Sequence, residues 1–189
     1  MATATEVLRK EHDAILKMIE ATETTAARLA RGEKVPDSIL AGLIEFFQQF
    51  ADRCHHGKEE EVFFPRLVEK GMPQKDGPVG VMLQEHEMGR ELIRRMSHAE
   101  GDYRAGAPGA AASWALAARS YAALLREHIT KENDVLFVMA EQMLSEAEQR
   151  KLAETFERVE IERMGAGTHE RLHASMEQLL REVGSGPAH

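Results

Sequence analysis

Two stretches of the chain repeat one arrangement of histidine, lysine and glutamate. The first reads HHGKEEEVFF from His55, and the second reads EHITKENDVLF from Glu127. Both contain His-x-x-Lys-Glu, so His55 and Glu59 correspond to His128 and Glu132. A duplication that keeps these side chains in register indicates that they share one task.

Each stretch follows a Glu-His pair at a similar interval, and the pairs contain His12 and His86. Residues four positions apart lie on one face of a helix, so each His-x-x-x-Glu pair can hold one ion from one side. His12 and His86 would then add one ligand each from two other helices. The candidate metal ligands are His12, His55, Glu59, His86, His128 and Glu132.

Both glutamates fall on predicted inward stripes that carry no lysine or arginine. An unpaired carboxylate in a dry core costs several kcal/mol, and a bound cation is the simplest compensation. Two divalent ions would carry more positive charge than two carboxylates neutralise. We therefore expect a centre of two ions also to contain a bridging hydroxide or oxide, or carboxylates that bridge the metals.

The residues beside these ligands have less defined roles. His56, Glu60 and Glu61 are rotated off the stripe, so we expect them to be solvated or to support the ligands from behind. Lys58 and Lys131 are expected at the surface, although their repetition leaves a supporting role open.

Apolar residues at helical spacing predict helices over residues 5–31, 36–70, 79–100 and 110–144. Ser145 with Glu148 forms a capping box for a fifth helix to residue 164, and Thr168 can cap a sixth to residue 183. The predicted fold is all-α. It is an up-down-up-down four-helix bundle over residues 1–144, with a C-terminal helical hairpin and tail over residues 145–189. The inward stripe of the fourth helix reads Tyr121, Leu125, His128, Glu132, Val135 and Met139.

The net charge of −8 argues against nucleic acid or an anionic membrane as partner. The single cysteine, Cys54, cannot form an internal disulfide, and we expect a buried thiol with a redox role left open. No basic segment precedes an apolar run, and no window has about 18 consecutive apolar residues. We therefore expect a soluble cytoplasmic protein, either a monomer or a homodimer.

The chain resembles the hemerythrin-like, or HHE cation-binding, family. The motifs HHGKEEEVFFP, LQEHEM and HITKENDVLF carry the resemblance from His12 to Met139, and GAGTHERLH resembles the tail of longer bacterial members. The resemblance implies two non-haem iron ions with an oxo or hydroxo bridge, held by the six candidate ligands. It also implies a small-molecule partner, which would be dioxygen, nitric oxide or hydrogen peroxide, and a role in stress defence.

Two positions depart from the oxygen-carrying members. Arg90 stands where they have a second histidine, and Glu132 lies four residues after His128 where they have an aspartate at five. A coordination position is then open or filled by another donor, and the extra ligands or supporting residues that we consider are Tyr121, His56 and Arg90. An open position on iron favours reaction with peroxide or nitric oxide over reversible oxygen carriage.

Alternative functions use the same ligands. A sensor would bind gas or change oxidation state without turnover, so the sequence leaves open whether the protein is an enzyme. Iron storage would need many irons per chain, and the bundle has ligands for two. Iron-sulfur cluster repair ranks lower, because the related repair proteins carry an additional cysteine-bearing N-terminal segment. The ligand types suit iron, manganese or zinc, and only the resemblance favours iron.

A zinc-dependent hydrolase is the remaining alternative. Residues 169–173 read HERLH, which fits the HExxH pattern of zinc proteases. A third ligand would have to be Glu177 or His189. This short pattern also arises by chance in charged helices, so a surface helix is the preferred interpretation. His98 is likewise expected at the surface.

Overall fold

The computed structural model describes residues 2–165 and 167–184, without the side chains of Met164, His169 and Glu170. Within these ranges every regular element is a helix, which confirms the all-α prediction. None of the described helices combines the length and the apolar character that a bilayer crossing requires.

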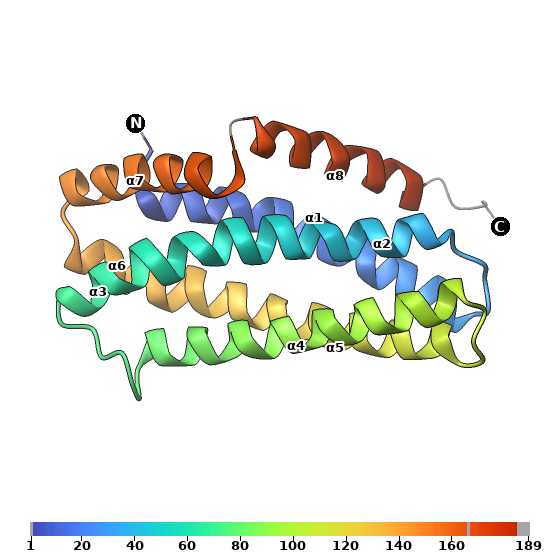
Figure 1. The fold of residues 1–189 in the computed structure, drawn as a ribbon. Coiled ribbons are helices and arrows are strands. Elements are labelled where there is room, and N and C mark those ends of the chain that lie inside the picture. Colours follow the sequence, from blue (N-terminus) through green and yellow to red (C-terminus); the bar gives the residue numbers. More distant parts are fainter. Residues whose placement is uncertain (1, 166, 185–189) are drawn as a thin grey trace.

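Long helical rods lie side by side along the molecule (Figure 1). The first rod is α1 (Ala4–Ala30), and the third is α4 (Pro78–Arg104). The second consists of α2 (Asp37–Phe46), η1 (Phe47–His56), η2 (Glu59–Phe63) and α3 (Phe64–Glu69). The fourth consists of α5 (Ala110–Lys131), η3 (Glu132–Leu136) and α6 (Phe137–Met143). These bounds agree with the predicted helices to within a few residues.

The second and fourth rods change from α-helical to π-helical winding beside the candidate ligands, in η1, η2 and η3. A π-helix hydrogen-bonds from residue i to i+5, so each turn is wider, and such turns are frequent at functional sites. The winding shifts which side chains face inward. Leu136 is 1% exposed whereas Val135 is 49% exposed, so the inward position predicted for Val135 was wrong.

Side-chain packing places the candidate ligands between two apolar clusters. One cluster includes Ile15, Ile93 and Leu125, and the other includes Leu8 and Phe137. In each rod the candidate ligands fall between members of the two clusters along the sequence. The fold therefore builds a polar layer across an otherwise apolar interior.

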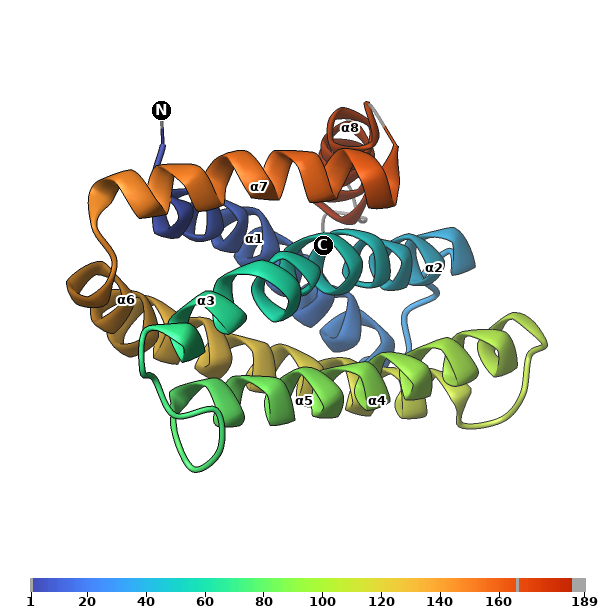
Figure 2. The same ribbon diagram turned by 60° about the vertical axis from the view of Figure 1, so that its left-hand side comes forward.

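The last two helices cover one face formed by the first and second rods (Figure 2). The first of them, α7 (Glu146–Met164), begins at the predicted capping box, in which Ser145 and Glu148 bond each other's backbone N–H groups. It packs against α1, η1 and η2, whereas α8 (Thr168–Gly184) packs against α1 and α2. Phe156 of α7 is 1% exposed and belongs to the same apolar cluster as Phe137.

Candidate metal centre

Buried histidines and glutamates from all four rods meet in two groups. Within each group, one ligand atom from every residue lies within 4.8 Å of the others. The first group consists of His12, His55, Glu59 and Glu132, and the second of His56, Glu59, His86 and His128. The structure thus brings all six predicted ligands together and adds His56.

Glu59 belongs to both groups. Its Oε1 lies 3.6 Å from Nε2 of His55, and its Oε2 lies 3.5 Å from Nε2 of His86. Burial and the neighbouring Glu132 carboxylate raise the pKa of Glu59 well above its ordinary value. Without a cation, two carboxylates this close cannot both carry charge at low cost.

Glu132 also reaches both groups. Its Oε2 lies 3.1 Å from Nε2 of His12 and 3.4 Å from Nε2 of His128. Burial alone would raise the pKa of Glu132, but the nearby imidazoles, with His128 foremost, outweigh burial and lower it. Each of the two carboxylates therefore lies beside imidazoles of both groups.

Most ligand atoms of the two groups lack hydrogen bonds within the described part of the chain, whereas Nε2 of His86 and Nε2 of His128 lie 3.1 Å from each other. Each such buried atom costs about 1–3 kcal/mol when it has no partner. Cations between the groups would satisfy these atoms together, so the donor set fits two metal ions. The atoms are Nε2 of His12, Nε2 of His55, both ring nitrogens of His56, and all four carboxylate oxygens of Glu59 and Glu132.

The Nδ1 atom of each of the four predicted histidine ligands has a hydrogen-bond partner. When Nδ1–H donates to an acceptor, the Nε2 lone pair is left free and aimed at the centre. In the two Glu-His pairs, the glutamates also have a role: Glu11 orients His55 and Glu85 orients His128, each on another rod. The Nδ1 partners are Glu11 for His55 at 2.8 Å, Glu60 for His86 at 2.7 Å, Glu85 for His128 at 3.0 Å and Asn133 for His12 at 3.0 Å.

The repeated lysines hold two of these carboxylates. Lys58 donates to Oε1 of Glu11 at 2.5 Å and lies 2.5 Å from Oε2 of Glu160 on α7, while Lys131 donates to Glu85. Lys58 is only 2% exposed, so the surface position predicted for it was wrong. Burial would lower the pKa of Lys58, but its carboxylate partners outweigh burial and raise it, so the ammonium stays charged.

His56 was expected to be solvated or supporting, and the solvated alternative is wrong. Its side chain is buried, and its ring stacks on His86 with centroids 3.9 Å apart. Because a π-helix has more residues per turn, neighbouring side chains diverge less, and His55 and His56 both point inward from η1. Burial lowers the pKa of His56, which favours the neutral imidazole that metals bind. The His-His doublet was the only sequence signal for this role.

Arg90 and Tyr121, the other two residues considered as extra ligands, line a cavity of about 190 Å³ that also touches His56 and His86. The Arg90 guanidinium donates to Asp52 at 2.8 Å and to Glu60 at 2.7 Å. It therefore supports the centre from behind. Burial raises the pKa of Tyr121, so its phenol stays protonated in the metal-free protein.

Other candidate groups contribute less chemistry. Cys54 is buried as expected, and burial raises the pKa of its thiol to about 12, which suppresses its reactivity. In the HExxH pattern, the His173 ring packs edge-on against Phe50 with centroids 5.7 Å apart. The side chains of His169 and Glu170, and all of His189, lie outside the described residues. His98 is exposed as predicted.

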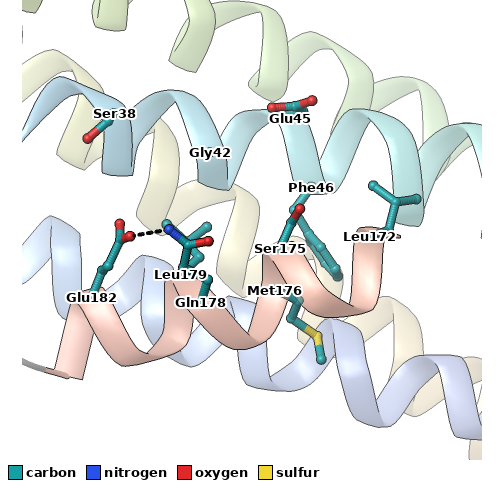
Figure 3. A pocket seen from close by; sticks show the side chains of 10 residues that line it. All are labelled: Ser38, Gly42, Glu45, Phe46, Leu172, Ser175, Met176, Gln178, Leu179 and Glu182. Atoms are coloured by element: carbon teal, nitrogen blue, oxygen red, sulfur yellow. Dashed lines mark hydrogen bonds between the residues drawn. The ribbon is translucent and has the colours of Figure 1, made fainter. Parts of the chain in front are cut away.

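A second cavity, of about 290 Å³, lies between α2 and α8 (Figure 3). Phe46, Met176 and Leu179 supply much of its apolar wall. At Gly42 the two helices approach closely, because a Cβ there would lie 3.3 Å from Leu179. The cavity is lined by none of the candidate ligands, so the metal centre and this cavity are separate features.

Comparisons with known proteins give matches over most of the chain. The profile of the hemerythrin HHE cation binding domain matches residues 3–140. The iron-sulfur cluster repair protein DnrN of Neisseria gonorrhoeae is 29% identical over 142 residues, which cover 72% of this chain and 88% of that protein. The iron-sulfur cluster repair protein YtfE of Escherichia coli is 28% identical over 140 residues, covering 71% and 63%.

A mycobacterial relative matches a longer part of the chain. The uncharacterized protein Rv1995 of Mycobacterium tuberculosis is 27% identical over 163 residues, covering 86% of this chain but only 63% of that protein. The chain therefore spans less than two thirds of this relative's length. No solved structure gives a significant match.

Proposed function

The chain belongs to the hemerythrin HHE cation-binding family, and from that premise we propose that it holds two non-haem iron ions that react with hydrogen peroxide, nitric oxide or dioxygen. The observation that carries the proposal is the pair of buried ligand groups that share Glu59, with Glu132 also reaching both. We also propose that the four rods form an up-down-up-down bundle.

The proposed ligands divide between two positions. His12 and His55 would hold one ion, His86 and His128 would hold the other, and Glu59 and Glu132 would bridge them. His56 would complete the second position, because its ring stacks on His86 and both of its nitrogens lack hydrogen bonds within the described residues. Arg90 stands where the oxygen-carrying members have a histidine ligand, and His56 would supply an imidazole in its place.

Bound iron would supply Lewis acidity and electrons for reducing peroxide or for binding nitric oxide. The protein supplies orientation and the exclusion of water. Phe137 stacks on His12 with centroids 5.5 Å apart, and Phe64 stacks on His86 at 5.9 Å. These rings, both at most 2% exposed, separate the imidazoles from solvent on the side of the second apolar cluster.

Metal analysis with an optical spectrum tests the proposal. We expect two irons per chain and an oxo-bridge charge-transfer band that changes when peroxide is added. His128→Ala should lose at least one iron per chain, whereas the matched control His98→Ala, at an exposed histidine, should retain both. A protein that takes up no iron, or that stores many atoms per chain, would contradict the proposal.

A sensor and an enzyme would share this centre but differ in turnover. Steady consumption of peroxide by the iron-loaded protein favours an enzyme. A change in the exposure of α7 and α8 on ligand binding, without turnover, favours a sensor, because Glu160 of α7 pairs with Lys58, and Lys58 holds the Glu11 carboxylate that orients His55.

Iron-sulfur cluster repair is a second candidate, favoured by the names of the two relatives above. Repair would require the protein to release iron to a damaged cluster rather than retain it. Incubating the iron-loaded protein with an enzyme whose [4Fe–4S] cluster has been damaged by nitric oxide tests this. Recovery of that enzyme's activity together with loss of iron from this protein would support repair, and retention of both irons would oppose it.

A further inference from the structure

The two halves of the sequence repeat differ in the groups that hold their lysines. In the first half, Nζ of Lys58 lies 2.5 Å from Oε1 of Glu11 and 2.5 Å from Oε2 of Glu160 on α7. In the second half, Lys131 pairs with Glu85, and the described part of the chain gives it no second carboxylate. The α7 helix therefore makes two halves with matching sequences unequal.

Solvent reaches the two lysines to different degrees. The Lys58 side chain is 3% exposed, and the Lys131 side chain is 40% exposed. Glu160 is also held by Cys54, whose Sγ donates to Oε2 of Glu160 at 3.5 Å. Water screens an exposed ion pair, whereas the charges of a buried pair interact at a lower dielectric constant. The lysine of the first half therefore holds its carboxylate partners more firmly than the lysine of the second half.

The carboxylate that Lys58 holds orients a proposed metal ligand. Oε2 of Glu11 lies 2.8 Å from Nδ1 of His55, and an imidazole that donates this hydrogen bond turns its Nε2 towards the first ligand group. Two carboxylates and one ammonium also leave net negative charge beside His55, which favours a cation there. Glu160 can thus act on the metal centre, although α7 lies outside the residues that match the family profile.

Other contacts keep α7 docked on the bundle if this one is lost (Figure 2). Phe156 is buried in the apolar cluster on one side of the candidate ligands. Glu148, near the start of α7, pairs with Arg66 at 2.6 Å. Arg163, near its end, pairs with Glu61 of η2. The effect of one α7 carboxylate on the metal centre can therefore be measured separately from the effect of undocking the helix.

We propose that Glu160 is a positioning residue for the half of the metal centre that contains His55, and that it links the docking of α7 to the ion held there. The inference deepens the proposed function and rests on it for the presence of the ions. Because such a linkage is reciprocal, the ion stabilises the docked helix as much as the docked helix stabilises the ion. His128 of the other half is oriented by Glu85, which Lys131 holds without α7.

The full metal-free chain provides the first test. Solvent exchange of the Nδ1–H proton of His55, measured by NMR, should be severalfold faster in Glu160→Gln, because Lys58 is then no longer held between two carboxylates. The Nδ1–H proton of His128 should exchange at an unchanged rate. Glu157→Gln is the matched control, since it removes an exposed carboxylate from the same helix. Equal exchange rates for His55 in the wild type and in Glu160→Gln would overturn the proposal.

Titration of the full chain with Co²⁺, whose visible absorption reports its ligands, is the second test. Loss of a group that supports a ligating histidine costs about 10–100-fold in metal affinity. Glu160 acts through two intermediate residues, so we expect Glu160→Gln to weaken one ion by about tenfold and to leave the other unchanged. The control Glu61→Gln removes the pair with Arg163 and loosens α7, but it should leave both affinities unchanged. Equal weakening of both ions in Glu160→Gln, or the same weakening in Glu61→Gln, would refute the positioning role.

Hydrogen exchange of the α7 backbone amides, with and without Co²⁺, tests the reciprocal effect. In the wild type the bound ion should slow this exchange, and in Glu160→Gln the protection should be lost. Protection that is the same in both proteins would contradict the linkage. If no Co²⁺ binds at all, the proposed function fails, and the exchange rate of the His55 proton alone decides whether Glu160 positions this ring.

Discussion

Replacing Lys58 by methionine should destabilise the protein far more than the same change at Lys131, although the two lysines occupy equivalent positions in the repeat. The Lys58 side chain is 3% exposed and lies between Glu11 and Glu160, which are 6% and 19% exposed. Removing one partner of a buried ion pair costs about 3–5 kcal/mol, because the remaining charges are left uncompensated.

Lys131 provides the matched control. Its side chain is 40% exposed, and its bond to Glu85 is therefore screened by solvent. Such pairs contribute about 0–1 kcal/mol. For a chain of this size, 1 kcal/mol shifts the melting temperature by about 2–4 °C. We therefore expect a loss of about 6–20 °C in Lys58→Met and at most about 4 °C in Lys131→Met.

Denaturant unfolding and thermal scans of the metal-free proteins measure these differences. Titration with iron adds a second observable, because Glu11 orients the His55 ring, and loss of such orientation costs about 10–100-fold in metal affinity. If the two variants lose the same stability, the burial argument fails. If Lys58→Met loses stability but binds iron as tightly as wild type, Lys58 has only a structural role.

Three further predictions concern stability. Phe156→Ala should lower the free energy of unfolding by about 3–5 kcal/mol, and faster hydrogen exchange in α7 should locate the loss; unchanged exchange would contradict this. Lys70, Ser145 and Arg66 lower the pKa of Glu148, so its contribution to stability is present above the unfolded value near 4.5 and is lost as pH falls through the folded pKa. Glu148→Gln should therefore destabilise the protein at neutral pH but not in strong acid. Urea unfolding at several pH values measures this, and a loss of unfolding free energy that does not change with pH would contradict it. Within the described residues, the buried Trp114 Nε1 has no hydrogen-bond partner, so removing this N–H in Trp114→Phe should offset part of the packing lost with the larger ring. The loss of unfolding free energy should stay below the about 3–5 kcal/mol of a Trp→Ala change, and a larger loss would contradict this.

Much of the architecture followed from local periodicity. Apolar residues at helical spacing were enough to locate the helices to within a few residues. The Ser145 capping box was also predictable, because its bonds join residues three apart. The duplicated His-x-x-x-Glu pairs identified residues that the structure brings together.

The sequence determined which side chains are available, and the tertiary structure decided which of them meet. An α-helical period predicted Lys58 at the surface and left His56 either solvated or supporting, whereas π-helical winding turns His56 inward and Glu160 of α7 covers Lys58. The pairing of Glu11 with His55 joins different rods and leaves no periodic signal. Helical periodicity is a local property of the backbone, but burial and charge pairing depend on neighbours that only the packed chain supplies.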